Sequence, residues 1–194
     1  MHDSLIKHIN SHISTSLTAS QEELIKDAFI HQKIRKGQFL LREGQICKYS
    51  AFLVKGAMRQ YTVDQRGVEH IIRLMIENWW AVDRESFVMH TPSAYYIDAW
   101  EDTDVLLISK AGSLCLPEQI PAWTQWTRKL DENYVISTQR RLNASISLPA
   151  ERRYIDFEDR HPEFVGRFPQ HIIASYLGIT KETLSRVRRL SAKK

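Results

Sequence analysis

The chain has 194 residues, of which 43% are hydrophobic and 26% charged, a composition typical of a soluble globular protein rather than a disordered one. No apolar run reaches the roughly 18 residues that span a bilayer, and the N-terminus lacks the basic start and apolar stretch of a secretory signal. The formal net charge is +4, and two cysteines, Cys47 and Cys115, are too few for a disulfide framework or for an iron–sulfur cluster within one chain. We therefore expect a cytoplasmic protein with reduced thiols and no membrane partner.

The N-terminal segment, residues 5–30, is predicted to be helical. Ser20 is placed to cap a helix, and Glu23 three residues later would complete a capping box. His8 and His12 are spaced i and i+4, so haem stays open as a ligand, but two exposed polar histidines are the simpler interpretation. The apolar face of the second part of this segment is formed by Leu24, Ile25, Ala28 and Phe29.

Between residues 33 and 109, short apolar runs alternate with glycine-containing turns. Asp64–Gly67 has the composition of a hairpin turn. Several short strands at roughly even spacing predict a β-sandwich, jelly roll or barrel. The predicted strands lie at residues 39–41, 51–54, 58–63, 70–76 and 105–108.

After Pro121 the pattern becomes helical again. Apolar and aromatic residues follow a three/four spacing over about 25 residues, which predicts a long helix that packs against a second copy of the chain. The alternative is a helix that lies on its own sheet. A shorter helix is predicted from Pro149 to Glu158, followed by a polar link from Asp159 to Gly166. The residues that carry the long stripe are Trp123, Trp126 (or Thr127), Leu130, Tyr134 and Ser137.

The last 27 residues predict two helices that cross around a short turn. Pro169 suits the first turn of the first helix, and Gly178 suits a turn that needs a positive φ. Thr180 can cap the second helix with its hydroxyl group. Ala174 allows close approach of the two helices, as in a helix-turn-helix. The apolar positions of the pair are Ile173, Leu177, Ile179, Leu184 and Val187.

The exposed face of the second helix is predicted to read DNA. Arg186 can bond guanine O6 and N7, and Glu182 can accept a hydrogen bond from a cytosine amino group. Lys181, Arg188 and Arg189 suit phosphates, which supply affinity rather than sequence choice. Between Lys181 and Lys194 there are six cations and one acid, and the bland alternative is a solvated basic tail. The predicted DNA-binding residues are Lys181, Glu182, Ser185, Arg186 and Arg189.

Residues 173–186, IASYLGITKETLSR, resemble the recognition motif of the Crp/Fnr family of transcriptional regulators. Residues 34–45 and 52–59 resemble the opening strands of that family's cyclic-nucleotide-binding β-roll. The resemblance implies an α+β protein with three parts: a double-stranded β-helix (jelly-roll) sensor domain at 1–118, a dimerisation helix at 119–147 and a helix-turn-helix at 148–194. It implies double-stranded DNA, a second copy of the chain and RNA polymerase as partners. Because the chain stops soon after the second helix, we expect the family's wing to be missing or truncated.

The stretches that match the family's nucleotide pocket depart from its pattern. Val82 and Asp83 stand where the family has Gly and Glu, and Ser93-Ala94 stand where it has Arg and Ser. Without that arginine a buried phosphate would lack its main counter-ion, which argues against cyclic AMP. Three readings remain: another small effector, a degenerate pocket, or a role through partners alone. The candidate effector residues are Trp80, Val82, Asp83, Arg84, Ser93, Ala94 and Tyr95, with Arg84 several residues from the family's arginine position.

These observations favour a sequence-specific DNA-binding transcriptional regulator that acts as a homodimer and needs no cofactor. No nucleophile elbow, phosphate-binding glycine loop or zinc-ligand motif is present, so we expect no enzymatic activity. The alternative is a cyclic-nucleotide-binding-like protein that signals through protein contacts without specific DNA readout.

Overall fold

The computed structural model describes residues 1–191, which divide into two compact units. The first unit comprises Met1–Thr62 and Met75–Asp131, and the second comprises Val63–Leu74 and the chain from Glu132 onward. The described strands are β1 (Ile30–Ile34), β2 (Phe39–Leu41), β3 (Tyr49–Lys55), β4 (Met58–Val63), β5 (Glu69–Met75), β6 (Trp80–Ala81), β7 (Tyr96–Ala99) and β8 (Thr103–Ser109).

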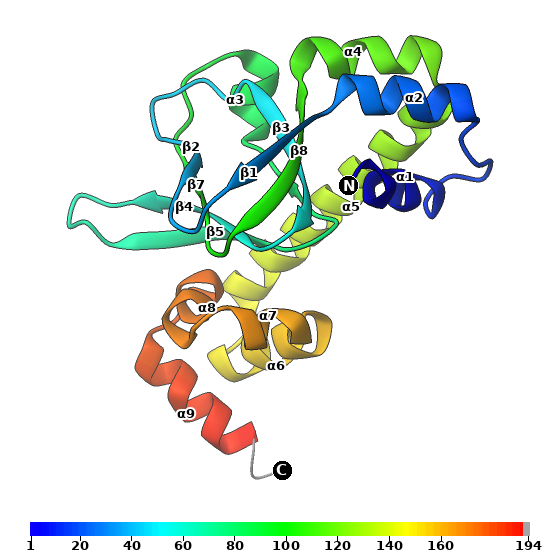
Figure 1. Cartoon of the computed structure of the whole chain (residues 1–194). Coiled ribbons are helices and arrows are strands. Elements are labelled where there is room, and N and C mark those ends of the chain that lie inside the picture. The colour runs from blue at the N-terminus through cyan, green and yellow to red at the C-terminus, as the bar shows by residue number, and fades with distance from the viewer. Residues whose placement is uncertain (192–194) are drawn as a thin grey trace. The chain divides into compact units, whose positions relative to one another are not determined.

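The strands form two four-stranded sheets with the orders β1-β8-β3-β6 and β2-β7-β4-β5 (Figure 1). Neighbours such as β3 and β8, and β4 and β7, pair antiparallel, which gives the expected jelly roll. The predicted strands at 39–41 and 58–63 are confirmed residue for residue. The other three predicted strands are confirmed with ends that differ by one or two residues.

Strand β8 has apolar residues on both of its faces. Val105 and Leu107 lie in a core that residues of both sheets share, and this core fills the roll. Leu106 and Ile108 lie in a second core, which the first sheet shares with helices at both ends of the first unit. A strand buried on both faces needs a continuous apolar run rather than an alternating one, and this explains the sequence VLLI.

The N-terminal segment, predicted to be helical over 5–30, forms two helices, α1 (His2–Asn10) and α2 (Ala19–Ala28). Thr18, not Ser20, caps α2. The Thr18 hydroxyl accepts a hydrogen bond from the Gln21 N–H at 3.3 Å, and the Gln21 side chain accepts one from the Thr18 N–H at 3.0 Å. This reciprocal pair is a capping box, and it leaves Ser20 inside the first turn.

His8 differs from its expectation as an exposed histidine. It is half-buried, and the centre of its ring lies 5.4 Å from that of Phe52 and 6.1 Å from that of Trp126. Burial among these rings disfavours the imidazolium form and lowers the pKa of His8 to about 4, with a smaller contribution from nearby His12.

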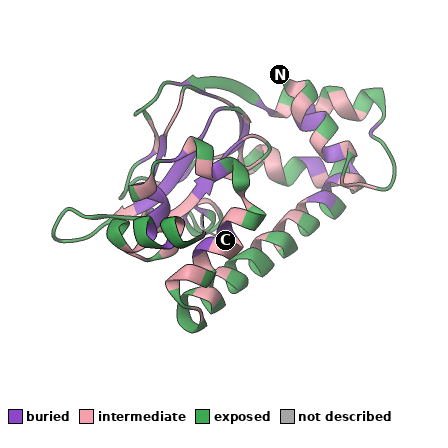
Figure 2. Ribbon diagram, turned by 90° about the horizontal axis from the view of Figure 1, so that it is seen from below, coloured by how far each residue is buried: buried purple, intermediate pink, exposed green. Residues whose placement is uncertain are grey.

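Three further helices complete the first unit or begin in it: α3 (Arg84–Met89), α4 (Lys110–Gln119) and α5 (Pro121–Ser147). The predicted long helix is confirmed as α5, with 27 residues. Trp123 and Trp126, which were predicted to face a second copy, instead pack in the core of the first unit, as the alternative of a helix on its own sheet had it. Most of the later residues of α5 are exposed (Figure 2). None of the described helices is both long and apolar enough to cross a membrane.

The C-terminal helices are α6 (Ala150–Arg160), α7 (Pro162–Arg167), α8 (Gln170–Leu177) and α9 (Lys181–Ser191). The polar link predicted at Asp159–Gly166 was wrong, because Pro162 begins α7 and Phe164 on that helix is 1% exposed. Residues 192–194, which include Lys193 and Lys194 of the basic segment, lie outside the described residues, as does any wing beyond α9. The core of these helices consists of Tyr154, Phe157, Phe164, Phe168, Ile172, Ile173, Ala174, Leu184 and Val187.

Candidate nucleic-acid interface

The turn between α8 and α9 has the geometry that the sequence predicted. Gly178 adopts φ +66° and ψ +37°, the left-handed conformation that glycine reaches at no steric cost. The Ile179 N–H bonds back to the Ala174 carbonyl at 3.0 Å, and the Gly178 N–H to the Ser175 carbonyl at 3.1 Å. These two bonds close the end of α8 as in a Schellman motif, and they fix the angle at which the next helix leaves.

Thr180 begins α9 as predicted. Its hydroxyl oxygen accepts a hydrogen bond from the Thr183 N–H at 3.2 Å. Leu184 and Val187 are buried, and Ala174 on α8 is 2% exposed. Two details differ: Pro169 is the N-cap of α8 rather than a residue of its first turn, and Ile172, which sequence reasoning left out, is buried beside Ile173.

The exposed face of α9 carries the predicted DNA-binding residues. Glu182, Ser185, Arg186 and Arg189 have the i, i+3, i+4, i+7 spacing of one helix face, and Lys181 precedes them at the first position. All five side chains are exposed. The structure therefore brings these five residues together on one open surface.

Electrostatics keep Glu182 ionised at the start of α9. Hydrogen bonds from its own backbone N–H and from the Thr180 side chain lower the pKa of the Glu182 carboxyl group, and Lys181 acts in the same direction. A carboxylate at this position accepts hydrogen bonds only, as readout of a cytosine amino group requires.

Arg188 differs from its neighbours on α9 because it is partly buried. It lies close enough to Tyr154 of α6 to bond the phenol group. Burial, together with a 2.7 Å hydrogen bond to Glu158, raises the pKa of Tyr154 to about 12. Arg188 therefore ties α9 to α6, in addition to any contact with phosphate.

The candidate effector residues do not meet at one point of the roll. The Trp80 ring packs on Phe29, Phe52 and Trp126, with centroids 6.2, 5.5 and 5.7 Å away, and so belongs to the core outside the roll. Val82 lies in the core inside the roll. Ala94 is exposed.

The polar candidates are engaged with the backbone or with a helix. Asp83 caps α3 and accepts hydrogen bonds from the Glu85 and Ser86 N–H groups. The Ser93 hydroxyl accepts one from the Tyr95 N–H at 3.0 Å. The Arg84 guanidinium pairs with Asp131 of α5 at 2.6 Å, and both side chains are about half exposed.

The buried arginine of the roll, Arg59, is also paired. Its Nε and Nη2 atoms contact the two carboxylate oxygens of Asp98 at 2.9 and 3.0 Å. Because side chains alternate along β4, Arg59 points away from the face that carries Met58 and the roll core. Neither Arg59 nor Arg84 therefore provides a counter-ion for a phosphate inside the roll.

Gln60 is a candidate that sequence reasoning missed. It shares the inward face of β4 with Met58, pairs with Ile97 of β7 and is 4% exposed. Its Oε1 atom is buried without a hydrogen-bond partner among the described residues. The available signal was a glutamine at an inward position of an alternating strand, where an apolar residue is usual.

Comparisons with known proteins agree with the fold. Residues 31–114 match the model of the cyclic nucleotide-binding domain family. No curated protein sequence is significantly similar to the chain.

Solved structures share the fold at low sequence identity. FixK2 from Bradyrhizobium japonicum is 17% identical, with 85% of each chain covered and a TM-score of 0.73. A Crp/Fnr-family protein from Eubacterium rectale is 18% identical over 90% of this chain and 83% of its own, with a TM-score of 0.67. The c-di-GMP-responsive regulator CLP from Xanthomonas campestris is 13% identical over 91% and 93%, with a TM-score of 0.67. Residues 31–114 are therefore similar to the cyclic nucleotide-binding domain family, and the chain as a whole shares the fold of solved Crp/Fnr-family structures.

Proposed function

We propose that this protein is a transcriptional regulator that binds specific duplex DNA as a homodimer, with α9 in the major groove. The observation that carries the proposal is the exposed face of α9, on which two basic side chains and one ionised acid flank Ser185 and Arg186. The left-handed turn at Gly178 and the buried face of α8 fix the position of α9 and leave its opposite face exposed. A recognition helix held in this way can enter a groove about 12 Å wide.

The residues of α9 divide into two roles. Arg186 and Glu182 read base edges, Arg186 through guanine and Glu182 through cytosine. Lys181 and Arg189 contact phosphates and add affinity without sequence choice. Ser185 lies between the two readers and can bond either a base or a phosphate.

The dimer is proposed from α5. Val135, Leu142 and Ile146 are 51%, 59% and 77% exposed, and their spacings of seven and four residues place them on one stripe. Gln139 falls on the same stripe, where a polar residue favours one register of two paired helices. Two copies joined along this stripe present two recognition helices, as a two-fold symmetric DNA site requires.

Control by a small effector other than cyclic AMP is part of the proposal. Gln60 offers a buried carbonyl oxygen inside the roll, whereas Arg59 and Arg84 are both paired with carboxylates. A neutral ligand that donates a hydrogen bond would satisfy this oxygen, whereas an anionic cyclic phosphate would gain no counter-ion from either arginine. The regulator CLP, which is described as responsive to c-di-GMP, has the same fold, so the fold accommodates effectors other than cyclic AMP.

A thermal-shift titration tests the effector statement. We expect cyclic AMP and cyclic GMP to leave the melting temperature of the full chain unchanged up to millimolar concentration. A saturable rise with either nucleotide would contradict the argument from the missing counter-ion.

A salt series tests DNA binding itself. Fluorescence anisotropy with a selected duplex and a random duplex of equal length should give dissociation constants that rise steeply with salt for both. The selected duplex should bind at least about 10³-fold more tightly at physiological salt. Binding of neither duplex would favour the alternative, a protein that signals through protein contacts alone.

A further inference from the structure

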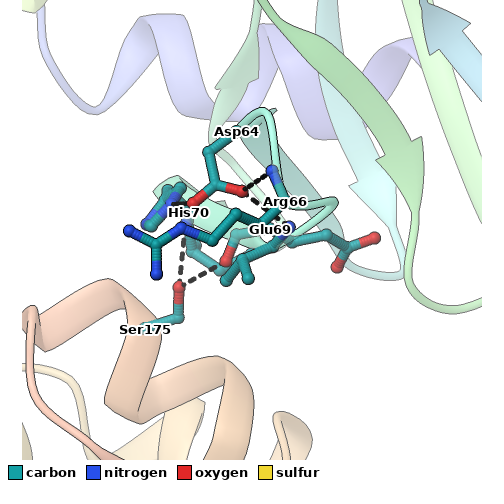
Figure 3. A network of polar contacts seen from close by, with 7 residues as sticks. Asp64, Arg66, Glu69, His70 and Ser175 are labelled. Atoms are coloured by element: carbon teal, nitrogen blue, oxygen red, sulfur yellow. Dashed lines mark hydrogen bonds and ion pairs between the residues drawn. The ribbon is translucent and has the colours of Figure 1, made fainter.

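Helix α8 is hydrogen-bonded to strand β5 within the second unit, which contains Val63–Leu74. The Ile71 N–H donates to the Ser175 hydroxyl oxygen at 3.0 Å, and that hydroxyl group donates to the Glu69 carbonyl at 3.1 Å (Figure 3). One serine side chain thus bonds a donor and an acceptor of the same strand. Because β5 is the last strand of its sheet, these contacts occupy backbone groups at a sheet edge.

Asp64 makes several hydrogen bonds in the turn before β5, and these bonds stabilise the turn that precedes the strand bound by α8. One Asp64 carboxylate oxygen accepts hydrogen bonds from the N–H groups of Arg66 and Val68 at 2.8 and 3.0 Å. The other oxygen lies 3.0 Å from Nε2 of His70 (Figure 3). These hydrogen bonds therefore connect the turn to the first residues of β5 without any contribution from α8.

Arg141 of α5 contacts the same strand and the same helix. Its Nη2 atom donates to the carbonyls of Ile71 and Tyr176, both at 3.1 Å, and its Nη1 atom donates to the carbonyl of Ile72. The guanidinium group also lies over the Tyr176 ring, 4.3 Å from the centroid. A single side chain therefore connects three elements: α5, β5 and α8.

The Arg141 contact uses the favourable chemistry of a helix end. The carbonyls of Tyr176 and Leu177 belong to the last turn of α8 and have no partner within that helix. Arg141 binds the first of them, and the Arg153 Nη1 atom binds the second at 2.9 Å. Cations at a helix C-terminus also interact favourably with the helix dipole.

We infer that Arg141 and Ser175 are positioning residues: they hold α8 and α9 against β5 and α5, and so set the spacing between the two recognition helices of the dimer. The inference rests on the proposed function. The 3.6-residue period places Arg141 about 120° around α5 from the Val135–Leu142–Ile146 stripe. One side of α5 thus meets the partner copy, and another side fixes the helix-turn-helix.

Rigid spacing has a measurable consequence for DNA choice. Two recognition helices held at one separation accept half-sites about one helical turn apart and reject other spacings. Recognition helices that lack the contacts of Arg141 and Ser175 sample several separations. These contacts therefore raise the preference for one half-site spacing without changing how a single half-site is read.

The test uses the full-length protein and three measurements on Ser175→Ala and Arg141→Ala. Hydrogen exchange reports the Ile71 amide, which loses its acceptor in Ser175→Ala. Anisotropy measures affinity for a single half-site and for paired half-sites whose spacing varies by one and two base pairs. Controls are Ser113→Ala, whose hydroxyl bonds only its own helix at 2.8 Å among the described contacts, and Arg140→Ala, an exposed neighbour of Arg141.

We expect faster exchange at Ile71 and a preference for the best spacing that falls by about twofold to tenfold, which corresponds to the net free energy of about one hydrogen bond. Half-site affinity should stay unchanged, the controls should behave as wild type, and Ser175→Thr, which keeps a hydroxyl group, should restore part of the preference. Unchanged exchange and unchanged spacing preference in both variants would overturn the inference. If the wild-type protein does not bind a half-site, the proposed function is overturned instead.

Discussion

The dimer stripe of α5 gives a prediction whose size follows from exposure. Leu142 and Ile146 are 59% and 77% exposed, and fully burying such a side chain is worth about 1.5–3 kcal/mol. Covering the exposed parts of both residues in both copies therefore stabilises the dimer by about 4–8 kcal/mol as an upper bound. Replacing both residues with serine should remove most of this free energy. Because both side chains are exposed in the single chain, the free energy of unfolding of the monomer should change by less than about 0.5 kcal/mol per site.

Sedimentation equilibrium measures the outcome. Even a loss of about 2 kcal/mol weakens the dimer dissociation constant about 30-fold, so the Leu142→Ser/Ile146→Ser variant should be mainly monomeric at concentrations where the wild type is dimeric. Arg140→Ser, about 140° around α5 from the stripe, is the matched control and should remain dimeric. A change below about threefold, or an equal change in the control, would refute the assignment of this stripe to the dimer interface.

Three further predictions concern DNA readout, the turn and pH. Arg186→Ala should weaken binding to the selected duplex by about 1–3 kcal/mol and relax base choice, whereas Arg189→Ala should weaken all duplexes alike in anisotropy titrations; equal losses for Arg186→Ala on both duplexes would argue against readout. Gly178→Ala should lower the free energy of unfolding measured in urea by about 1–2 kcal/mol, because alanine disfavours the positive φ at this position. Steric clash adds little, since the nearest atom to a new Cβ, Arg153 Nη1, lies at an ordinary 3.5 Å. Unchanged stability would argue against the left-handed turn. The folded pKa of His8 is about 4 and its unfolded value 6.5, so the unfolded chain binds the proton first as pH falls. The folded state therefore loses about 1–2 kcal/mol of stability as the pH falls from 6.5 to 4, after allowance for solvent screening of a half-buried ring. Calorimetry should show that the stability of His8→Gln depends less on pH over this window than that of the wild type. An equal pH dependence in the two proteins would contradict the burial of His8.

Local signals explain most of what the sequence predicted correctly. Gly178, Thr180 and the apolar residues around them act within a few positions of one another, so the helix-turn-helix was predictable from spacing. Strands β2 and β4 were predictable because turns flank both short segments.

The errors have equally physical causes. Thr18-x-x-Gln21 and Ser20-x-x-Glu23 both fit a capping box, and only the backbone path decides which one forms. Helix α7 has six residues, which is too short to show a helical period. Trp80 was predicted to line an effector pocket, but it packs against the core outside the roll. Its sheet is buried on both faces, so alternation does not distinguish the inside of the roll from the outside.

Contacts between residues far apart in the chain could not be predicted from the sequence. Ser175 and Ile71 are 104 residues apart, and nothing in either segment indicates that they meet. Gln60 was likewise overlooked because its inward position depends on the pairing of β4 with β7. Both sites depend on which face of a strand, or which edge of a sheet, is covered.

Selection of duplex DNA from a random library by the wild-type protein tests whether α9 reads DNA as part of a symmetric dimer. We expect enrichment of a two-fold symmetric sequence with half-sites centred about 10–10.5 base pairs apart, or a multiple of that distance. We also expect Arg186→Ala to lose preference at one symmetric pair of positions within that sequence. Recovery of sequences with no shared motif, or of a motif without two-fold symmetry, would contradict this expectation.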